Sequence, residues 1–317
     1  MSHGRVIAVT GATGFLGRHV VEALVREGRS VRILARHDGT EAIWRGISFE
    51  VVLGSLEEPQ SLERLTRGAD AVVHAAGLVK ARDTADFLRV NRDGTWAIAQ
   101  ATRQYAPAAR FVAVSSLAAR EPQLSEYAES KRAGEEAACR AYRDDPDRLV
   151  IVRPPVIYGP WDAASLAIFK TASHALVPVF GSGRISIVHV TDAAAAIARL
   201  ATGAGAAGLY TLADCNPGGY SAKELLGEAA RAVGRTPRFV RIPAGAVLAA
   251  GRASAWWAGL RGRPPLLSAG KAREMLHPDW SVSSSELLPY SIYRSRIGIS
   301  EGFRTTAAWY KEAKWLH

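Results

Sequence analysis

The chain has 317 residues, of which 48% are hydrophobic, 22% are charged and only two are cysteines. This composition excludes a disordered or fibrous protein, and also a small domain that depends on several disulfides or a zinc cluster. The formal net charge is +10, but the basic residues are mostly arginines spread along the whole chain, which indicates a solvated basic surface and no nucleic-acid partner.

The beginning of the chain and its apolar stretches predict a protein without stable membrane insertion. A short apolar run leads directly into a glycine-rich turn, unlike a signal peptide, and the stretch Ile242–Gly251 is too short to span a bilayer. We therefore expect a cytoplasmic location. The segment Ala244–Arg263, with Trp256 and Trp257, is expected to be a packed helix or a flap over a site, and contact with a membrane surface is the alternative.

Short apolar runs alternate with amphipathic segments of helical length through the first half of the chain. The predicted strands are Val6–Thr10, Val31–Ala35, Ser48–Leu53, Ala71–His74, Arg110–Ser115 and Leu149–Val152. The predicted helices between them are Gly14–Glu27, Pro59–Arg67, Ala85–Tyr105 and Tyr127–Tyr142. This alternation predicts βαβ units and therefore an α/β fold with a doubly wound, Rossmann-type parallel sheet.

Single residues predict where two of these helices end or begin. Gly28 follows Arg26-Glu27 as a helix stop, and Pro59 suits the first turn of a helix. Further along, a strand at Ile185–Val190 and a helix at Thr191–Leu200, capped by Thr191 or Asp192, are expected to return to the sheet.

The alternation weakens after Pro160, where Pro, Gly, Ser and Trp become frequent. We expect residues 1–165 to form a dinucleotide-binding domain, joined by the returning strand and helix at about residues 185–212. Residues 166–184 and 213–317 are expected to form a smaller, irregular C-terminal substrate-binding lobe over the carboxyl ends of the strands.

A glycine-rich turn joins the first predicted strand to the first predicted helix, in the run Thr10-Gly-Ala-Thr-Gly-Phe-Leu-Gly17. Gly11 allows a tight turn, Gly14 lets the backbone approach a pyrophosphate, and Gly17 permits close packing of helix on strand. The helix N-terminus offers unpaired N–H groups to the anion. The turn therefore predicts dinucleotide binding.

Arg36 ends the second predicted strand, where a site that prefers NAD would place an acidic residue. Because a guanidinium makes bidentate bonds to phosphate, we expect NADP(H) to be preferred, with NAD(H) as the alternative. In that alternative Arg36 stacks on adenine or points to solvent, and Asp38 binds the ribose.

Three residues further along predict acid–base chemistry. Tyr127 and Lys131 lie four residues apart and so share one helix face, and Ser116 follows the fifth predicted strand. Tyr127 is a candidate general acid or base, Ser116 a hydrogen-bond donor to the substrate oxygen, and Lys131 the residue that tunes Tyr127. An adjacent ammonium and an oxidised nicotinamide are expected to lower the pKa of Tyr127.

Together these motifs resemble the extended short-chain dehydrogenase/reductase family, also described as the NAD-dependent epimerase/dehydratase type. The resemblance covers nearly the whole chain. It rests on Thr10–Gly17, His74-Ala-Ala-Gly77, Asn91-Arg-Asp-Gly-Thr95, Ser115-Ser116, Tyr127–Lys131, Arg153-Pro-Pro-Val-Ile-Tyr-Gly-Pro160 and His189-Val-Thr-Asp192.

The resemblance implies a role for each matching residue. The implied cofactor-binding residues are Gly11, Thr13, Gly14, Phe15, Leu16, Gly17, Arg36, Ser55, Leu56, Ala75, Ala76, Gly77, Tyr127, Lys131, Pro154 and Val156. The implied catalytic residues are Ser116, Tyr127 and Lys131, no metal is expected, and a homodimer is implied. Asn91 would either support a proton relay or stabilise a helix bend, and His189 would belong to the returning strand.

Three departures from the family pattern narrow the expected function. Ser55-Leu56 replace an Asp-hydrophobic pair that contacts adenine, and Leu117-Ala118 replace the Asp-Glu pair of sugar-nucleotide dehydratases. Val156 stands where sugar-nucleotide enzymes have an Asn that touches the substrate phosphate. In this the segment resembles the steroid and flavonoid reductases. We therefore expect an NAD(P)-dependent oxidoreductase that interconverts a secondary alcohol and a ketone on a mostly apolar small molecule.

Two alternatives remain open. A nucleotide-sugar epimerase with retained NAD would use the same Tyr and Ser, and Arg184, Arg199 and Arg252 could then bind a diphosphate. A non-catalytic dinucleotide-binding subunit would retain the fold without the chemistry.

Overall fold

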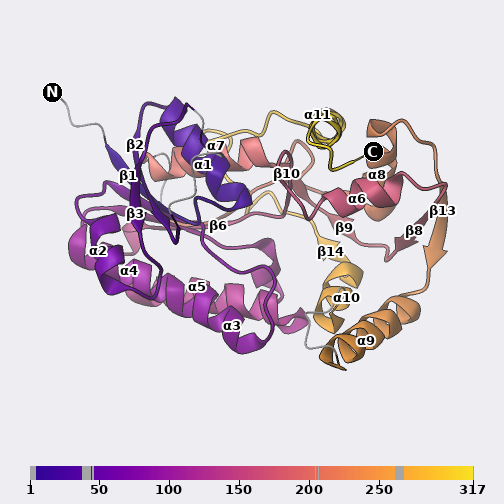
Figure 1. The fold of residues 1–317 in the computed structure, drawn as a ribbon, viewed down its shortest axis with the longest axis horizontal. Helices are drawn as coiled ribbons and strands as arrows, with labels where there is room; N and C mark the ends of the chain where they lie inside the picture. Colours follow the sequence, from indigo (N-terminus) through magenta and orange to yellow (C-terminus); the bar gives the residue numbers. More distant parts are fainter. Residues whose placement is uncertain are drawn as a thin grey trace.

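A seven-stranded sheet, parallel at every pairing, forms the larger half of the molecule (Figure 1). The computed structural model describes residues 5–37, 44, 46–203, 205, 207–260 and 268–316. In spatial order the strands are β11 (Gly208–Thr211), β6 (Leu149–Arg153), β5 (Arg110–Val114), β4 (Ala71–His74), β1 (Val6–Thr10), β2 (Ser30–Ala35) and β3 (Glu50–Leu53). The predicted doubly wound α/β fold is confirmed.

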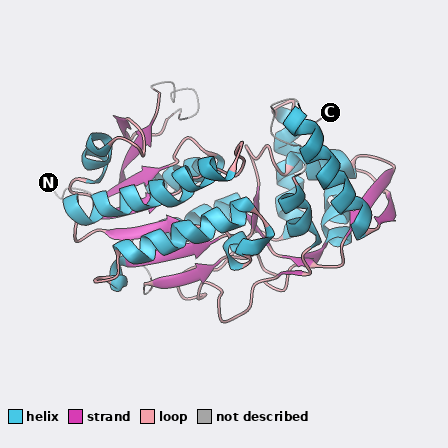
Figure 2. Ribbon diagram, turned by 90° about the horizontal axis from the view of Figure 1, so that it is seen from below, coloured by secondary structure: helices cyan, strands magenta, loops and turns pink. Residues whose placement is uncertain are grey.

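Helices cover both faces of this sheet (Figures 1 and 2). One face carries α1 (Phe15–Arg26) and α7 (Val190–Ala201), and the other carries α2 (Pro59–Thr66), α4 (Gly94–Tyr105) and α5 (Glu126–Ala141). Each face has its own buried apolar cluster. Burial on both faces explains why the strands read in the sequence as continuous β-branched runs.

The strand order reverses between β1 and β4, which are neighbours in the sheet although β2 and β3 lie between them in sequence. In open α/β sheets the crevice beyond the carboxyl ends of such a strand pair binds the ligand. The glycine-rich turn follows β1 and the His74-Ala-Ala-Gly77 segment follows β4, so both flank this crevice.

The predicted helix boundaries at Gly28 and Pro59 are confirmed. Gly28 has a φ of +73° just beyond the end of α1, where a left-handed residue ends a helix. Pro59 occupies the first turn of α2. The helix predicted at 85–105 is instead divided into α3 (Thr84–Leu88), a π-helical turn (Arg89–Asp93) and α4.

The prediction that a strand at residues 185–190 pairs with the central sheet is wrong. Those residues form β9 (Arg184–Ile185) and β10 (Ile187–His189), which lie in small separate sheets. The seventh strand of the central sheet is β11, which pairs with β6. β11 is an edge strand with the sequence Gly-Leu-Tyr-Thr, so it lacks the apolar run of Val and Ile that marks the inner strands.

The predicted cap of the following helix is also corrected. His189 caps α7, since its Nδ1 accepts a hydrogen bond from the Thr191 N–H at 3.3 Å. Asp192 is buried and its carboxylate accepts hydrogen bonds from the Tyr293 hydroxyl and from the N–H groups of Arg296 and Ile297. A long-range loop therefore takes the carboxylate that would otherwise cap the helix.

Outside the central sheet, the described strands form only small sheets (Figure 2). These are β10 with β7 (Val156–Tyr158), β9 with β12 (Tyr220–Ser221) and β14 (Asp279–Trp280), and β8 (Leu176–Phe180) with β13 (Arg238–Ile242). The described helices of the C-terminal lobe are α6 (Leu166–Ala172), α8 (Ala222–Ala232), α9 (Ala244–Leu260), α10 (Ala269–Leu276) and α11 (Ile299–Glu312). The assignment of substrate binding to this lobe, and the domain boundaries given above, stay predictions.

The segment singled out at residues 244–263 lies partly in α9, and residues 261–263 lie outside the described residues. α9 packs on α10, with Gly251 against Ala272. Within the described part of the chain, the helices lack the combination of length and apolar character needed to cross a bilayer.

Candidate active site

The glycine-rich turn is packed so closely that Gly11 and Gly17 leave no room for a side chain. Gly11 has a φ of +71°, and a Cβ on it would lie 2.4 Å from the Ala76 nitrogen. A Cβ on Gly17 would lie 2.0 Å from the Gly11 oxygen. Gly14 is the N-cap of α1 and offers no side-chain cap, so the first N–H groups of the helix are open to an anion.

Arg18, which the sequence reasoning missed, adds a positive group beside this turn. Its side chain is buried over the ring of Trp161, 4.3 Å from the centroid, and its Nε and Nη1 atoms have no hydrogen-bond partner among the described residues. Burial lowers the pKa of Arg18. A buried guanidinium without partners is costly unless an anion pairs with it, so the turn and Arg18 fit a dinucleotide pyrophosphate.

A ladder of buried polar groups joins β1 to β4. The Thr10 hydroxyl lies 2.7 Å from His74 Nδ1, and His74 Nε2 lies 3.0 Å from the Thr95 hydroxyl. Because the Thr95 hydroxyl donates to the Asn91 oxygen, we assign the His74 proton to Nε2 and its acceptor to Nδ1. Burial lowers the pKa of His74 to about 3, so the ring is neutral and structural.

The ladder ends at Asn91, in the π-helical turn. Asn91 Oδ1 accepts from the Leu78 N–H at 2.8 Å, and Nδ2 donates to the Leu78 oxygen at 3.0 Å and to the Ser130 hydroxyl at 2.9 Å. These bonds occupy both amide protons. They hold the segment after β4 against α5. This agrees with a structural role for Asn91 at the helix bend, and a proton relay is not needed to explain its contacts.

Ser116, Tyr127 and Lys131 come together at the carboxyl end of β5. Ser116 follows the strand, and its hydroxyl lies close enough to Tyr127 to lower the pKa of the phenol. Ser125 caps α5 by accepting from the Ala128 N–H, which places Tyr127 in the first turn of that helix. Lys131, one turn later, donates to the Val114 oxygen at 2.8 Å.

Burial changes the acidity of two of these groups. Burial raises the pKa of Tyr127, the nearby Ser116 hydroxyl lowers it, and the charge of Glu274 raises it, with a net rise. The expected lowering by Lys131 is therefore not what the protein alone produces. Burial also lowers the pKa of Lys131 to about 8, against a raising effect of Glu135. Tyr127 is accordingly a neutral phenol, suited to donate a proton.

A buried ion pair between Glu135 and Arg153 lies beside Ser115, at the end of β5. Glu135 accepts two bonds from the Arg153 guanidinium, at 2.7 and 2.6 Å, and one from the Ser115 hydroxyl at 2.5 Å. Ser115 is thus engaged structurally, and Ser116 faces Tyr127. The sequence reasoning missed Glu135, although its position one turn after Lys131 on the same helix face could have indicated it.

The remaining cofactor candidates are spread along the same edge. Thr13 and Arg36 are exposed, and Phe15, Leu16, Ala75 and Ala76 are half-buried. Gly77 lies beside Lys131, because a Cβ on it would be 3.6 Å from Nζ. Asp38, the alternative ribose ligand, lies outside the described residues.

Four further cofactor candidates lie in two short segments, Ser55-Leu56 and residues 154–156. The Ser55 hydroxyl bonds to Glu57 and Glu58 in the turn before α2, and Leu56 packs where Gly94 leaves room for it. Pro154 is buried and its oxygen accepts from Leu117, whereas Val156 keeps 45% of its surface exposed.

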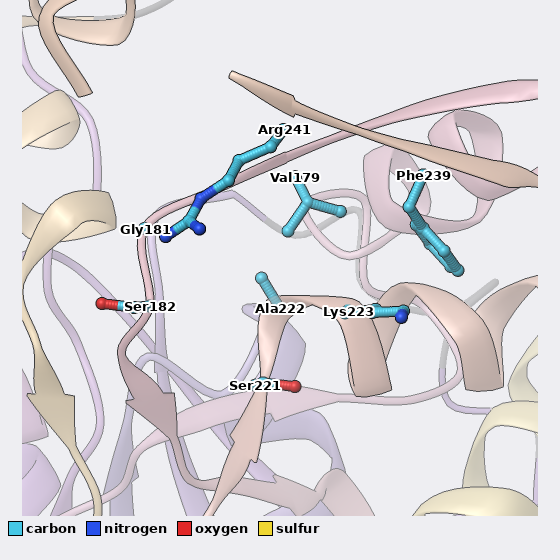
Figure 3. A pocket seen from close by; sticks show the side chains of 8 residues that line it. All are labelled: Val179, Gly181, Ser182, Ser221, Ala222, Lys223, Phe239 and Arg241. Atoms are coloured by element: carbon cyan, nitrogen blue, oxygen red, sulfur yellow. The ribbon is translucent and has the colours of Figure 1, made fainter. Parts of the chain in front are cut away.

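Two of the three arginines considered for a diphosphate have partners within the protein. Arg184 donates to the Gly218 and Gly219 oxygens, and Arg199 lies 3.8 Å from Glu27. A cavity of about 240 Å³ in the C-terminal lobe is lined by Val179, Gly181, Ser182, Ser221, Ala222, Lys223, Phe239 and Arg241 (Figure 3). None of the expected site residues lines it.

Comparison with known proteins agrees with the fold and the motifs. Residues 7–212 match the NAD dependent epimerase/dehydratase family. The chain is 45% identical over 313 residues to the ceramide reductase of Caulobacter vibrioides, covering 98% of this chain and 96% of that protein.

A more distant relative and a solved structure of similar fold also match. The chain is 35% identical over 176 residues to the 4-hydroxy-2-methyl-3-oxo-4-farnesyl-3,4-dihydroquinoline-1-oxide ketoreductase of Stigmatella aurantiaca, covering 50% and 52% of the two chains. The solved UDP-glucose 4-epimerase of Thermus thermophilus, a complex with NAD, matches with a TM-score of 0.70 at 23% identity over 98% of this chain and 99% of that chain. The family match and the reductase relatives support NAD(P)-dependent oxidoreduction, and the solved structure agrees with the fold. The chain belongs to the NAD-dependent epimerase/dehydratase family.

Proposed function

We propose that this protein is an NAD(P)H-dependent reductase that converts a ketone on a largely apolar lipid amide, of the ceramide type, into a secondary alcohol. The observation that carries the proposal is the half-buried Tyr127 phenol, close to Ser116 at the carboxyl end of β5 and one helical turn from Lys131. The similarity to a ceramide reductase over almost the whole chain supports the substrate class.

The residues divide the work of reduction. When bound, the dinucleotide supplies the hydride that reduces the carbonyl carbon. Tyr127 donates its proton to the carbonyl oxygen, and the Ser116 hydroxyl stabilises the negative charge that develops there. Lys131 orients the nicotinamide ribose and carries a positive charge near Tyr127.

The cofactor would lie along the carboxyl edge of the sheet. The turn at Gly11, Gly14 and Gly17 and the unpaired Arg18 nitrogens would hold the pyrophosphate. Arg36 is exposed at the end of β2 and would pair with the 2′-phosphate of NADP(H). The other expected cofactor residues line the path between these points and Tyr127.

Replacing Tyr127 by Phe tests the proposal. We expect kcat for reduction of a short-chain 3-keto ceramide in detergent micelles to fall roughly 100- to 10,000-fold, because the general acid is lost. Binding of NADPH, followed by quenching of tryptophan fluorescence, should be unchanged. The matched control is Tyr290→Phe, since the Tyr290 side chain is 57% exposed. Turnover by Tyr127→Phe at the rate of that control would overturn the assignment.

The assembly is also a proposal. We infer a homodimer through helices of the dinucleotide-binding half, and light scattering coupled to gel filtration tests it. A monomeric mass across the working concentration range would contradict the dimer.

A further inference from the structure

We propose that Glu274, a buried carboxylate of the C-terminal lobe, is a positioning residue that fixes the start of the helix that carries Tyr127 and places a carboxylate charge near its phenol. The inference rests on the role proposed for Tyr127. It assigns a function in the chemistry to a lobe otherwise expected only to bind substrate.

The geometry begins at the N-cap of α5. The Ser125 hydroxyl donates to Glu274 Oε1, while the same oxygen atom of Ser125 accepts from the Ala128 N–H at 3.0 Å. A single hydroxyl therefore links the lobe carboxylate to the first turn of the helix, two residues before Tyr127. The contact is close, because a Cβ on Gly270 would lie 2.8 Å from the Ser125 Cβ.

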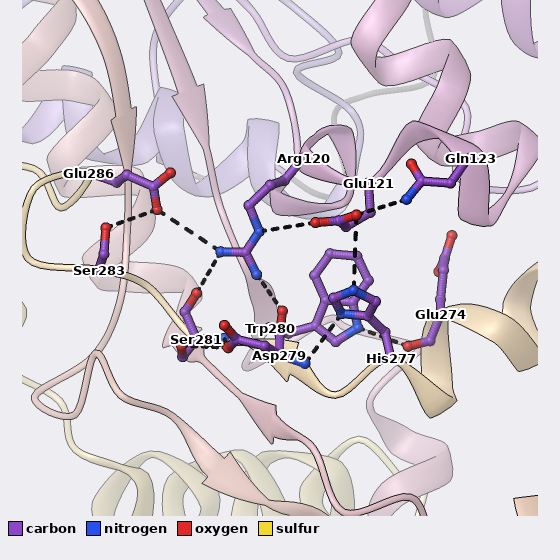
Figure 4. A network of polar contacts seen from close by, with 10 residues as sticks. All are labelled: Arg120, Glu121, Gln123, Glu274, His277, Asp279, Trp280, Ser281, Ser283 and Glu286. Atoms are coloured by element: carbon purple, nitrogen blue, oxygen red, sulfur yellow. Dashed lines mark hydrogen bonds and ion pairs between the residues drawn. The ribbon is translucent and has the colours of Figure 1, made fainter.

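Other contacts fix α10 in this position (Figure 4). The Trp280 indole donates to the Glu274 backbone oxygen at 2.8 Å, and Arg273 donates to the Leu124 oxygen at 2.8 Å. Arg120, four residues after Ser116, donates hydrogen bonds to the backbone oxygens of Ser281 and Asp279. The segment that follows Ser116 is thus bound to β14, which follows α10 in the chain.

The charges around Glu274 cancel only part of its effect on Tyr127. The Lys271 ammonium lies 2.9 Å from Glu274 Oε2 and partly neutralises it, but the Lys271 side chain is 61% exposed, so water weakens this attraction. Arg120, Glu121 and His277 face one another at 3.9–4.0 Å, and Arg273 bonds a backbone oxygen. From other elements Tyr127 meets Ser116 and the Phe87 ring, and Lys131 shares its helix.

Ionising Tyr127 would therefore place a second negative charge near Glu274 in a buried setting. Like charges that share such a site disfavour the ionised form, which agrees with the rise that Glu274 causes in the pKa of Tyr127. The protonated phenol is the form that donates in the reductive direction, so the lobe charge favours reduction.

The experiment compares pH profiles of kcat for reduction in the complete protein, with 3-keto ceramide in micelles as the probe. Glu274→Gln keeps an acceptor for Ser125 but removes the charge, so the alkaline loss of activity should move to lower pH. Lys271→Met removes the neutralising cation, so the loss should move to higher pH. Glu121→Gln, a carboxylate of the same contact region, is the matched control and should leave the profile in place.

A second readout does not depend on turnover. Carbon-13 NMR of ζ-labelled tyrosine, with the Tyr127 signal identified by its absence in Tyr127→Phe, should show the same opposite displacements of the Tyr127 titration. Titration curves that coincide with the unaltered protein in both variants would overturn the proposal. If Glu274→Gln does not fold, Lys271→Met alone decides. The titration also separates this inference from the proposed activity, which fails only if Tyr127→Phe retains turnover.

Discussion

The central-sheet half and the C-terminal lobe place their polar residues by different means. In the sheet half, segments after β1, β4, β5 and β6 meet at one edge because every strand is parallel. In the lobe, strands of two to five residues form separate small sheets, and their positions depend on contacts distant in sequence. Sites on a parallel sheet can therefore be anticipated from strand ends, whereas Glu274 reaches Ser125 across 149 residues.

The largest expected effect would sharpen this comparison by showing that the sheet half depends on its buried ion pair. Arg153→Met leaves Glu135 as an uncompensated buried charge, so we expect the free energy of unfolding, measured with urea, to fall by about 3–5 kcal/mol. The double variant Glu135→Leu/Arg153→Met should recover much of the loss. A single variant as stable as the parent protein would show that the pair is not buried in solution.

The next effect concerns recognition at a strand end. Arg36→Ala should weaken NADPH binding by roughly 10- to 100-fold, because a hydrogen-bonded ionic contact to phosphate contributes about 1.5–3 kcal/mol. NADH binding should change little. Fluorescence titration of both cofactors measures the two affinities. Equal losses for NADPH and NADH would show that Arg36 does not read the 2′-phosphate.

The smallest effect tests the lobe. Ser221 caps α8 in a reciprocal capping box with Glu224, so Ser221→Ala should cost about 1 kcal/mol of unfolding free energy. Cofactor affinity should be unchanged, since α8 packs on α6 and α11 within the lobe. A loss of NADPH binding would show that this part of the lobe is coupled to the crevice, and would contradict the separation between the two halves of the molecule.

Much of the dinucleotide crevice was predictable from particular residues. Gly11, Gly14 and Gly17 reveal a turn without room for side chains, and the spacing of Tyr127 and Lys131 puts both on one face of a helix. Arg18 was missed because an arginine in an amphipathic helix ordinarily points to water, and only the packing of Trp161 shows that its guanidinium is buried. The position of the seventh strand was missed because β11 has no apolar run.

By itself, the sequence determined the parallel sheet, its glycine turn and the order of Ser116, Tyr127 and Lys131, because backbone conformation and periodicity act over a few neighbouring residues. Only the tertiary structure decided that burial raises the pKa of Tyr127, that Ser115 bonds Glu135 while Ser116 lies near the phenol, and that a lobe carboxylate reaches the start of α5. Desolvation and long-range charge depend on which distant atoms exclude water, and no local pattern records them.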